Sequence, residues 1–312
     1  MSTPFREFAI PGSTSNLGPG FDALSVAVNV YLRVRVVDVR PDPGGRLELA
    51  FEGGGPAGEN RIDTAYALAS RRYGVPAKGL RAEVSSDIPM AAGLGSSAAA
   101  AVAGLHLYRL ARGMQLTIED MLALATELDG HPDNAAAALL GGMTLSCACD
   151  DGRILARAWD WPAEIRLIVA TPTVELETRA ARSVLPDHLP MRDAVANLQR
   201  ALLLLRALET GEYGDIREAM KDRWHQPARS ALVPGLPEAL AIDDPAILGV
   251  CLSGAGPSVL ALAAPGRADA AAAVLGDVYR RAGVPHTIRN LAAHPAAVDT
   301  LPRAAAERER TA

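Results

Sequence analysis

The stretch Pro89-Met-Ala-Ala-Gly-Leu-Gly-Ser-Ser-Ala-Ala99 is a glycine-rich loop that decides the fold, because regular patterns adjoin it on both sides. A strand pattern at 80–86 precedes it, and an alanine-rich run at 96–112 with good helix propensity follows. Gly93 and Gly95 allow the backbone to approach a ligand closely. Such a loop at a helix N-terminus presents unpaired N–H groups and a positive dipole end, which suit phosphate.

The same loop could also be a plain glycine turn before a buried helix. Two known nucleotide motifs are excluded. No Gly-Lys-Ser/Thr is present, as a Walker A loop requires. Ala98 occupies the third glycine position of the dinucleotide motif, and no acidic residue about twenty positions on closes a βαβ unit. Ser96 or Ser97 is expected to be the N-cap of the helix.

The composition is that of a globular chain, since 49% of its 312 residues are hydrophobic. We expect a boundary at a turn near residue 150, which gives an N-terminal domain over 1–150 and a C-terminal domain over 151–312. The net charge of −5 offers no basic surface for a nucleic acid. No apolar run reaches the ~20 residues that span a bilayer, so no membrane partner is expected.

The sequence favours a cytoplasmic location. Residues 1–8 lack the apolar core of a signal peptide. Cys147, Cys149 and Cys251 form no Cys-x-x-Cys pair, and a sparse, odd number of cysteines is typical of a reducing compartment.

The clearest secondary-structure signal is the period-two alternation at 26–39, which predicts a long half-buried strand. The segment 11–22 before it is too rich in Gly, Pro and Ser for regular structure to be expected. Other patterns predict strands near 46–51, 143–148, 165–170 and 286–290, a hairpin-like unit at 247–263, and helices at 62–73, 117–129, 132–140, 191–209, 214–223 and 268–282. This mixture lacks a strict strand–helix alternation and favours an α+β fold.

Two further segments carry polar side chains whose roles stay open on the residues alone. In Asn16-Leu-Gly-Pro-Gly-Phe-Asp22, the aspartate could bind an ammonium group and the asparagine could both donate and accept hydrogen bonds, or the segment could be an Asx-rich turn. Glu127-Leu-Asp-Gly-His-Pro-Asp-Asn134 could end a solvated helix face with a break at His131-Pro132. The chain has no His-Glu-x-x-His and no Gly-x-Ser-x-Gly, which disfavours zinc and serine hydrolases.

In combination these segments resemble the GHMP kinases, and within them the homoserine kinases. The family's phosphate loop, Pro-x-x-x-Gly-Leu-Gly-Ser-Ser-Ala, is met at every fixed position from Pro89 to Ala98. The resemblance extends over about residues 8–290, with the motifs in the family's order. The other matched segments are 16–22, 127–134, Thr178–Pro186, Asp222–Arg229 and the glycine loop Leu252–Leu260. Two positions depart from the pattern: Ala228 replaces a tyrosine, and Arg61 replaces an apolar residue after Asn60.

The resemblance implies a ribosomal-protein-S5-like N-terminal domain, a ferredoxin-like C-terminal domain, and ATP with Mg²⁺ as cofactors. It places ATP on the glycine loop and at an adenine pocket beside Asn60. The loop residues concerned are Pro89, Met90, Ala91, Ala92, Gly93, Leu94, Gly95, Ser96, Ser97, Ala98 and Ala99. By the same resemblance Ser97 and Glu127 would bind Mg²⁺, which prefers a few oxygen ligands together with substrate phosphate.

The implied reaction transfers the γ-phosphoryl group of ATP to the side-chain hydroxyl of L-homoserine. The expected acceptor-binding residues are Asn16, Asp22, His131, Asn134, Thr178, Arg182, Arg229 and Gly256. Arg182 and Arg229 would bind the carboxylate through their bidentate fork, although surface ion pairing is the alternative for both. Asp133 could act as a base, or Asn134 could only align the acceptor. Two other functions remain open: another GHMP kinase, such as a threonine kinase, or a non-catalytic ligand-binding regulator. A homodimer is also possible.

Overall fold

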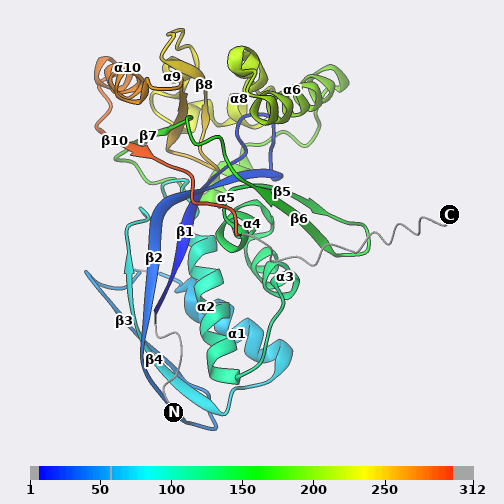
Figure 1. Cartoon of the computed structure of the whole chain (residues 1–312), viewed down its shortest axis with the longest axis vertical. Coiled ribbons are helices and arrows are strands. Elements are labelled where there is room, and N and C mark those ends of the chain that lie inside the picture. Colours follow the sequence, from blue (N-terminus) through cyan, green and yellow to red (C-terminus); the bar gives the residue numbers. More distant parts are fainter. Residues whose placement is uncertain (1–6, 57, 298–312) are drawn as a thin grey trace, which may run out of the picture.

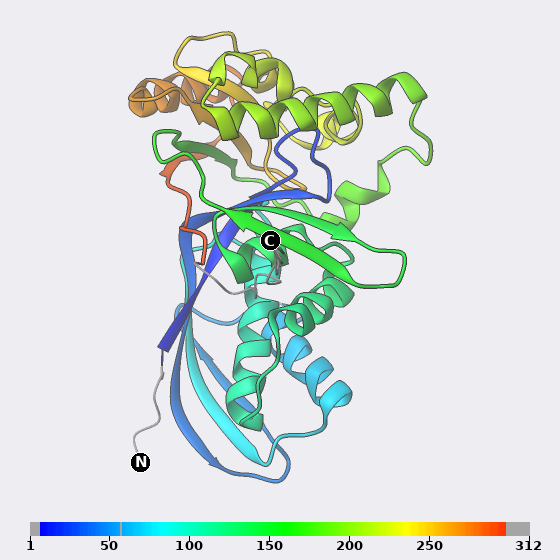
Figure 2. The ribbon, with the colours of Figure 1, turned by 45° about the vertical axis from the view of Figure 1, so that its right-hand side comes forward.

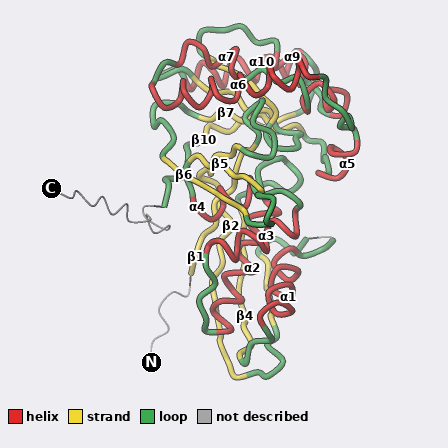
Figure 3. The backbone as a smooth tube through the Cα atoms, turned by 90° about the vertical axis from the view of Figure 1, so that its right-hand side faces the viewer, coloured by secondary structure: helices red, strands yellow, loops and turns green. Residues whose placement is uncertain are grey.

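The computed structural model of the chain describes residues 7–56 and 58–297, which form two β-sheets with their helices (Figure 1). The first part contains β1 (Glu7–Ser15), β2 (Leu24–Pro41), β3 (Leu47–Phe51), α1 (Arg61–Tyr73), β4 (Lys78–Ser86), α2 (Ser96–Arg112), α3 (Ile118–Asp129), α4 (Asp133–Leu140), β5 (Met143–Ala148) and β6 (Ile154–Trp159). Its strand order is β3-β4-β2-β5-β6, with β1 paired to β2. Helices α1 to α3 lie along one side of these strands (Figure 3).

The second part is an antiparallel sheet of order β10-β7-β9-β8. It contains β7 (Leu167–Pro172), α5 (Thr178–Ser183), α6 (Met191–Thr210), α7 (Ile216–Ala219), α8 (His225–Arg229), α9 (Leu236–Leu240), β8 (Ile247–Leu252), β9 (Val259–Ala263), α10 (Ala268–Arg281) and β10 (His286–Leu291). Short 3₁₀ turns at Tyr213–Asp215 and Ser230–Leu232 complete it. The predicted α+β class is confirmed. Among the described helices, none is both long enough and apolar enough to cross a membrane.

Strand β2 is the central element of the first sheet, because it pairs with β1, β4 and β5. The predicted alternation is confirmed, since Val26 and Val34 are fully buried whereas Asn29 and Arg35 are exposed. Helix α2 spans the predicted residues and packs closely on α1 through its small side chains. A Cβ atom on Gly104 would lie 2.2 Å from a backbone oxygen of α1, so only glycine permits this approach.

The prediction that residues 11–22 lack regular structure is wrong for residues 11–15, which belong to β1. Pro11 lies where the β1–β2 register shifts, so its missing N–H is tolerated. The hydroxyls of Ser13, Thr14 and Ser15 are buried, and each is hydrogen-bonded to another side chain. The polar composition that suggested a loop therefore belongs to a buried polar site.

Two further differences concern the middle of the chain. Strand β6 was not predicted, and it pairs with β5, so the change from the first sheet to the second falls between residues 159 and 167. The predicted helix at 214–223 is a 3₁₀ turn followed by α7, which ends at Ala219. The side chain of Asp222 accepts hydrogen bonds from the backbone N–H groups of Trp224 and Gln226, which starts a new helical segment instead.

Candidate active site

A cavity of about 510 Å³ is lined by residues from both halves of the chain. The first half contributes the glycine loop, the start of α2, the end of α3 and the segment at 131–134. The second half contributes α5, the end of α8 and the loop at 254–256. Asn16, Phe21 and Asp22, which follow β1, also line it.

The N-cap of α2 is Gly95 in the left-handed conformation, with φ of 71°, so the prediction of a serine cap is wrong. A Cβ atom at this position would lie 2.2 Å from the Ser13 hydroxyl, which excludes larger residues. Within the described residues, the backbone N–H groups of Ser96, Ser97 and Ala98 donate to no atom of the chain. These three residues line the cavity, so the first turn of α2 is open to an anion.

Ser253 connects the glycine loop to β1. Its hydroxyl donates to the Gly93 carbonyl at 2.6 Å and lies 2.9 Å from the Thr14 hydroxyl. The Gly254 N–H donates to the Ser15 carbonyl at 3.1 Å. The three glycine- or serine-rich segments that the sequence singles out therefore meet at one point, although they are far apart in the chain.

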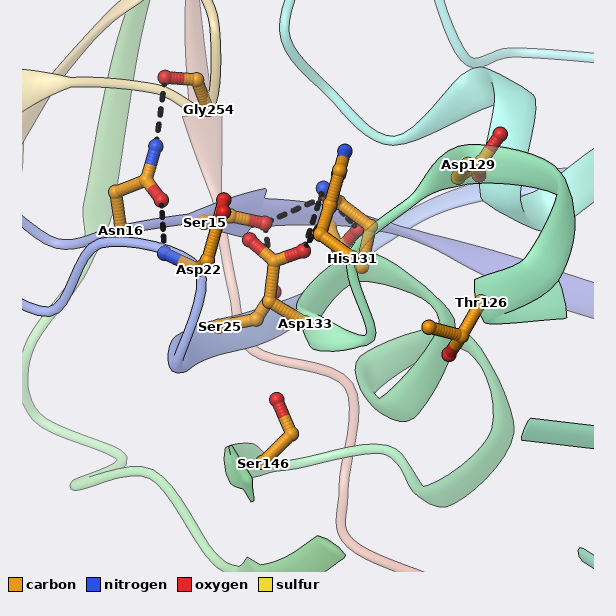
Figure 4. Close-up of polar contacts among 12 residues, drawn as sticks. Ser15, Asn16, Asp22, Ser25, Thr126, Asp129, His131, Asp133, Ser146 and Gly254 are labelled. Carbon is orange, nitrogen blue, oxygen red and sulfur yellow. Dashed lines mark hydrogen bonds and ion pairs between the residues drawn. The ribbon is translucent and has the colours of Figure 1, made fainter. Parts of the chain in front are cut away.

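Asn134 and Asp133 begin α4 and point toward this junction. The Asn134 Oδ1 atom accepts hydrogen bonds from the hydroxyls of Ser13 at 2.8 Å and Ser15 at 2.6 Å, which fixes the amide. Asp133 is buried, and its Oδ1 lies 2.5 Å from His131 Nδ1 (Figure 4). Burial disfavours the imidazolium of His131, but the hydrogen bond and charge of Asp133 outweigh it, so the pKa of His131 is raised.

Asp22 and Arg182 meet face to face across the cavity. The guanidinium donates to both carboxylate oxygens, at 3.0 and 2.6 Å, and each side chain is about one-third exposed. Asn16 fixes the loop that carries Asp22. Its Oδ1 accepts a hydrogen bond from the Asp22 N–H at 3.0 Å, and its Nδ2 donates to the Gly254 carbonyl at 2.8 Å (Figure 4). The residues predicted to bind opposite ends of an amino acid thus pair with each other here.

Arg229 is 1% exposed, so the surface ion pair considered as an alternative is wrong for this residue. Its Nε donates to the Ala181 carbonyl at 2.9 Å, and its guanidinium carbon lies 5.4 Å from the centre of the Phe21 ring. The guanidinium carbon of Arg182 lies at the same distance from that ring. Burial, followed by the charge of Arg182, lowers the pKa of Arg229 to about 10.

The carboxylate beside Ser97 is Asp129, whose Oδ1 accepts from the Ser97 hydroxyl at 3.0 Å. Glu127 does not line the cavity; it forms an exposed ion pair with Arg72 at 2.7 Å. The expected Ser97–Glu127 pair is therefore not formed. Burial raises the pKa of Asp129, although the Ser97 hydrogen bond and the charge of Arg61 oppose this.

The other predicted site residues divide into two groups. Thr178 and Gly256 line the cavity, as do Ala91 and Ala92 of the glycine loop. Leu94 and Ala99 are buried in the core, and Pro89, Met90 and Asn60 do not line the cavity. The side chain of Asn60 caps α1 by accepting from the Ile62 N–H. The residues that line the cavity without having been singled out for the site include Phe21, Arg61, Asp129, Glu177 and Arg179.

The fold is that of a known class of small-molecule kinases. Residues 60–142 match the GHMP kinases N terminal domain, and residues 204–281 match the GHMP kinases C terminal domain. The chain belongs to the GHMP kinase family, which confirms the resemblance found in the sequence.

Similar proteins include several homoserine kinases. That of Moorella thermoacetica is 36% identical over 287 residues, which is 91% of this chain and 95% of the relative. That of a Synechococcus strain is 38% identical over 284 residues, which is 88% of this chain and 89% of the relative. The crystal structure of the Cytophaga hutchinsonii homoserine kinase, 24% identical, shares the fold with a TM-score of 0.78 over 95% of this chain and 98% of that one.

Proposed function

We propose that this GHMP kinase is a homoserine kinase, which converts ATP and L-homoserine into ADP and O-phospho-L-homoserine in threonine biosynthesis. The observation that carries the proposal is a single cavity that combines the open N-terminus of α2 with Asp22, Arg182 and Arg229. The helix N-terminus suits a nucleotide's phosphates. One acid and two arginines suit the ammonium and carboxylate groups of an amino acid.

The nucleotide is expected to bind with its phosphates against the N–H groups of Ser96, Ser97 and Ala98. The Ser97 hydroxyl and the Asp129 carboxylate are adjacent oxygen donors at the same edge of the cavity, a set that fits Mg²⁺. When bound, Mg²⁺ neutralises charge on the phosphate oxygens. Arg61 approaches Asp129 at 3.7 Å and would have to yield to the cation.

The acceptor is expected to replace the Asp22–Arg182 ion pair. The acceptor's ammonium group then binds the Asp22 carboxylate, and the acceptor's carboxylate binds the guanidinium groups of Arg182 and Arg229. Because one intramolecular ion pair is exchanged for two with the ligand, a neutral or singly charged alcohol would gain less than a zwitterion. Thr178 and Gly256 also line the cavity and are expected to complete the contacts.

In the transfer step, the acceptor hydroxyl oxygen bonds to the γ-phosphorus, the bond from that phosphorus to the bridging oxygen of ADP breaks, and the hydroxyl proton moves to a phosphate oxygen. Positioning and charge stabilisation supply most of the catalysis in such reactions. We favour Asn134 as the aligning residue, because Ser13 and Ser15 fix its amide oxygen and leave Nδ2 as the donor. Asp133 is already engaged by His131, which disfavours it as the base.

An ADP-release assay over a panel of hydroxylated acceptors tests the proposal. The highest kcat/KM is expected with L-homoserine, and Asp129→Asn, assayed at a Mg²⁺ concentration that half-saturates the wild-type protein, is the low-activity control. Threonine differs from homoserine mainly in the shape around its secondary hydroxyl. A higher kcat/KM with threonine would make threonine the assigned acceptor. Binding of homoserine without ADP release would favour a non-catalytic regulator instead.

For the homodimer, we propose that a second copy of the chain covers α6, which lies along the surface of the second part (Figure 2). Four exposed apolar side chains form one stripe on this helix: Met191, Val195, Leu198 and Leu202. In an antiparallel pair of α6 helices this stripe would cover itself. The cytoplasm remains the expected location, in agreement with three cysteines that are all free.

A further inference from the structure

His225 is a buried residue at the start of α8 that the expected site does not include. We propose that His225, as a neutral imidazole, is a positioning residue that fixes Arg229 relative to the loop 16–22 and so shapes the pocket for the acceptor's carboxylate. This inference rests on the proposed function, because it concerns the same acceptor.

The two ring nitrogens of His225 face partners of opposite kind. Nε2 lies 2.7 Å from the Gly18 carbonyl oxygen, and Nδ1 lies 3.1 Å from a terminal nitrogen of Arg229. A carbonyl only accepts hydrogen bonds and a guanidinium only donates them. Nε2 must therefore carry the proton and Nδ1 must carry none. A doubly protonated ring would set an N–H group against the N–H groups of Arg229.

The Gly18 side of this bridge holds the loop that carries the predicted ammonium-binding residue. Gly18 has φ of 81°, and a Cβ atom there would lie 2.1 Å from the Met220 carbonyl oxygen, so the loop packs directly on the segment before α8. The Phe21 ring lies 5.1 Å from the His225 ring. A displaced His225 would therefore shift the loop and Arg229 together, with Asp22 at the end of that loop.

The surroundings of His225 keep the ring neutral. Complete burial is the largest influence, and it lowers the pKa of His225. The charge of Arg229 also lowers this pKa, whereas the charges of Asp222 and Asp22 and the hydrogen bond to the Gly18 carbonyl raise it without outweighing burial. The Asp222 carboxylate lies 3.7 Å from Nε2, but its oxygens already accept from Asn197 and from the Gln226 N–H. That carboxylate therefore holds the start of α8, and its distance from Nε2 is too long for a hydrogen bond.

Steady-state kinetics of three variants test the positioning role. His225→Leu keeps apolar volume but removes donor and acceptor, so the KM for homoserine is expected to rise about tenfold or more while that for ATP changes less than about twofold. His225→Gln offers both an amide oxygen and an amide N–H, so its KM for homoserine is expected to lie close to that of the wild-type protein. His188→Gln, at an exposed histidine before α6, is the matched control.

Nitrogen NMR of the histidine-labelled wild-type protein tests the tautomer without any acceptor. The signals that disappear in His225→Gln should come from a protonated Nε2 and an unprotonated Nδ1 at neutral pH, and a proton on Nδ1 would contradict the inference. A doubly protonated ring, an unchanged homoserine KM in His225→Leu, or equal effects of leucine and glutamine would overturn the inference. Because the ring signals need no substrate, they remain decisive even if the acceptor panel selects a compound other than homoserine.

Discussion

Replacing Asp129 with asparagine is expected to weaken Mg²⁺ binding strongly, because this carboxylate lies against Ser97. The Asp129 side chain is 9% exposed, and its oxygen is 3.0 Å from the Ser97 hydroxyl. Two unit charges 4 Å apart interact by about 4 kcal/mol near a protein surface. Since an amide oxygen keeps part of this interaction, we expect a loss of about 3 kcal/mol, or a roughly 100-fold rise in the Mg²⁺ concentration for half-maximal rate.

Glu127→Gln is the matched control, only two positions earlier on the same helix. Its side chain is 49% exposed and pairs with Arg72 at 2.7 Å. Exposed ion pairs contribute about 0–1 kcal/mol to stability, so the free energy of unfolding should fall by no more than this amount. The Mg²⁺ requirement should match that of the wild-type protein, because Glu127 does not line the cavity.

The assay measures ADP release against free Mg²⁺ at saturating homoserine, and Mn²⁺ binding followed by electron paramagnetic resonance gives a readout that needs no turnover. The reasoning is refuted if Glu127→Gln raises the metal requirement while Asp129→Asn behaves like the wild-type protein. That result would restore the ligand expected from the sequence and would require α3 to turn relative to α2.

Three further predictions concern the acceptor site, a histidine and α6. Arg182→Ala should raise the KM for homoserine about 10- to 100-fold through loss of a charge-assisted pair, whereas Arg179→Ala, which lines the same cavity, should have a small effect; equal effects would contradict the assignment. In urea titrations, His131→Gln should lower the free energy of unfolding more at about pH 6 than at about pH 9. The pKa of His131 is raised in the folded protein, so the protonated ring stabilises the fold fully below its ordinary pKa of 6.5. This stabilisation is lost as the pH rises through the raised pKa. Equal losses at both pH values would exclude the His131–Asp133 ion pair. Leu198→Glu should convert a dimer into an active monomer in light scattering, and a monomeric wild-type protein would remove the proposed pairing.

Most long elements could be predicted because their signals are local. The alternation in β2 and the bounds of α2, from residue 96 to residue 112, follow from periodicity and composition over many residues. Short elements were missed, because α5 and α8 have six and five residues and complete too few turns to show a period. They form where distant residues fix them, as Asn197 does by donating to the Asp222 side chain before α8.

The glycine loop shows a different limit of sequence reasoning. A serine after the second glycine predicts an N-cap, but the structure uses Gly95 and leaves the serines in the first turn. The reason lies outside the segment, since the Ser13 hydroxyl occupies the space where a side chain at position 95 would lie. The cap could be predicted only if β1 were already placed beside the loop.

Ser97 and Glu127 do not lie together, for a reason that helix geometry explains. Successive residues of an α-helix are rotated by about 100°, so Glu127 and Asp129 project in directions about 200° apart. A family pattern with an acid near this position does not determine which face meets Ser97. The structure does, because α3 turns Glu127 toward Arg72 of α1 and Asp129 toward the start of α2.

Backbone conformation at the site opposes local preference. Asn16, Asp22 and Ala91 are non-glycine residues with φ of 72°, 56° and 50°, and all three line the cavity. Such conformations cost roughly 1–3 kcal/mol each and persist only where surrounding contacts impose them. Asn16 is held by the Gly254 carbonyl and Asp22 by the guanidinium of Arg182. Because both contacts come from the second half of the chain, the acceptor site can form only after the two halves have docked.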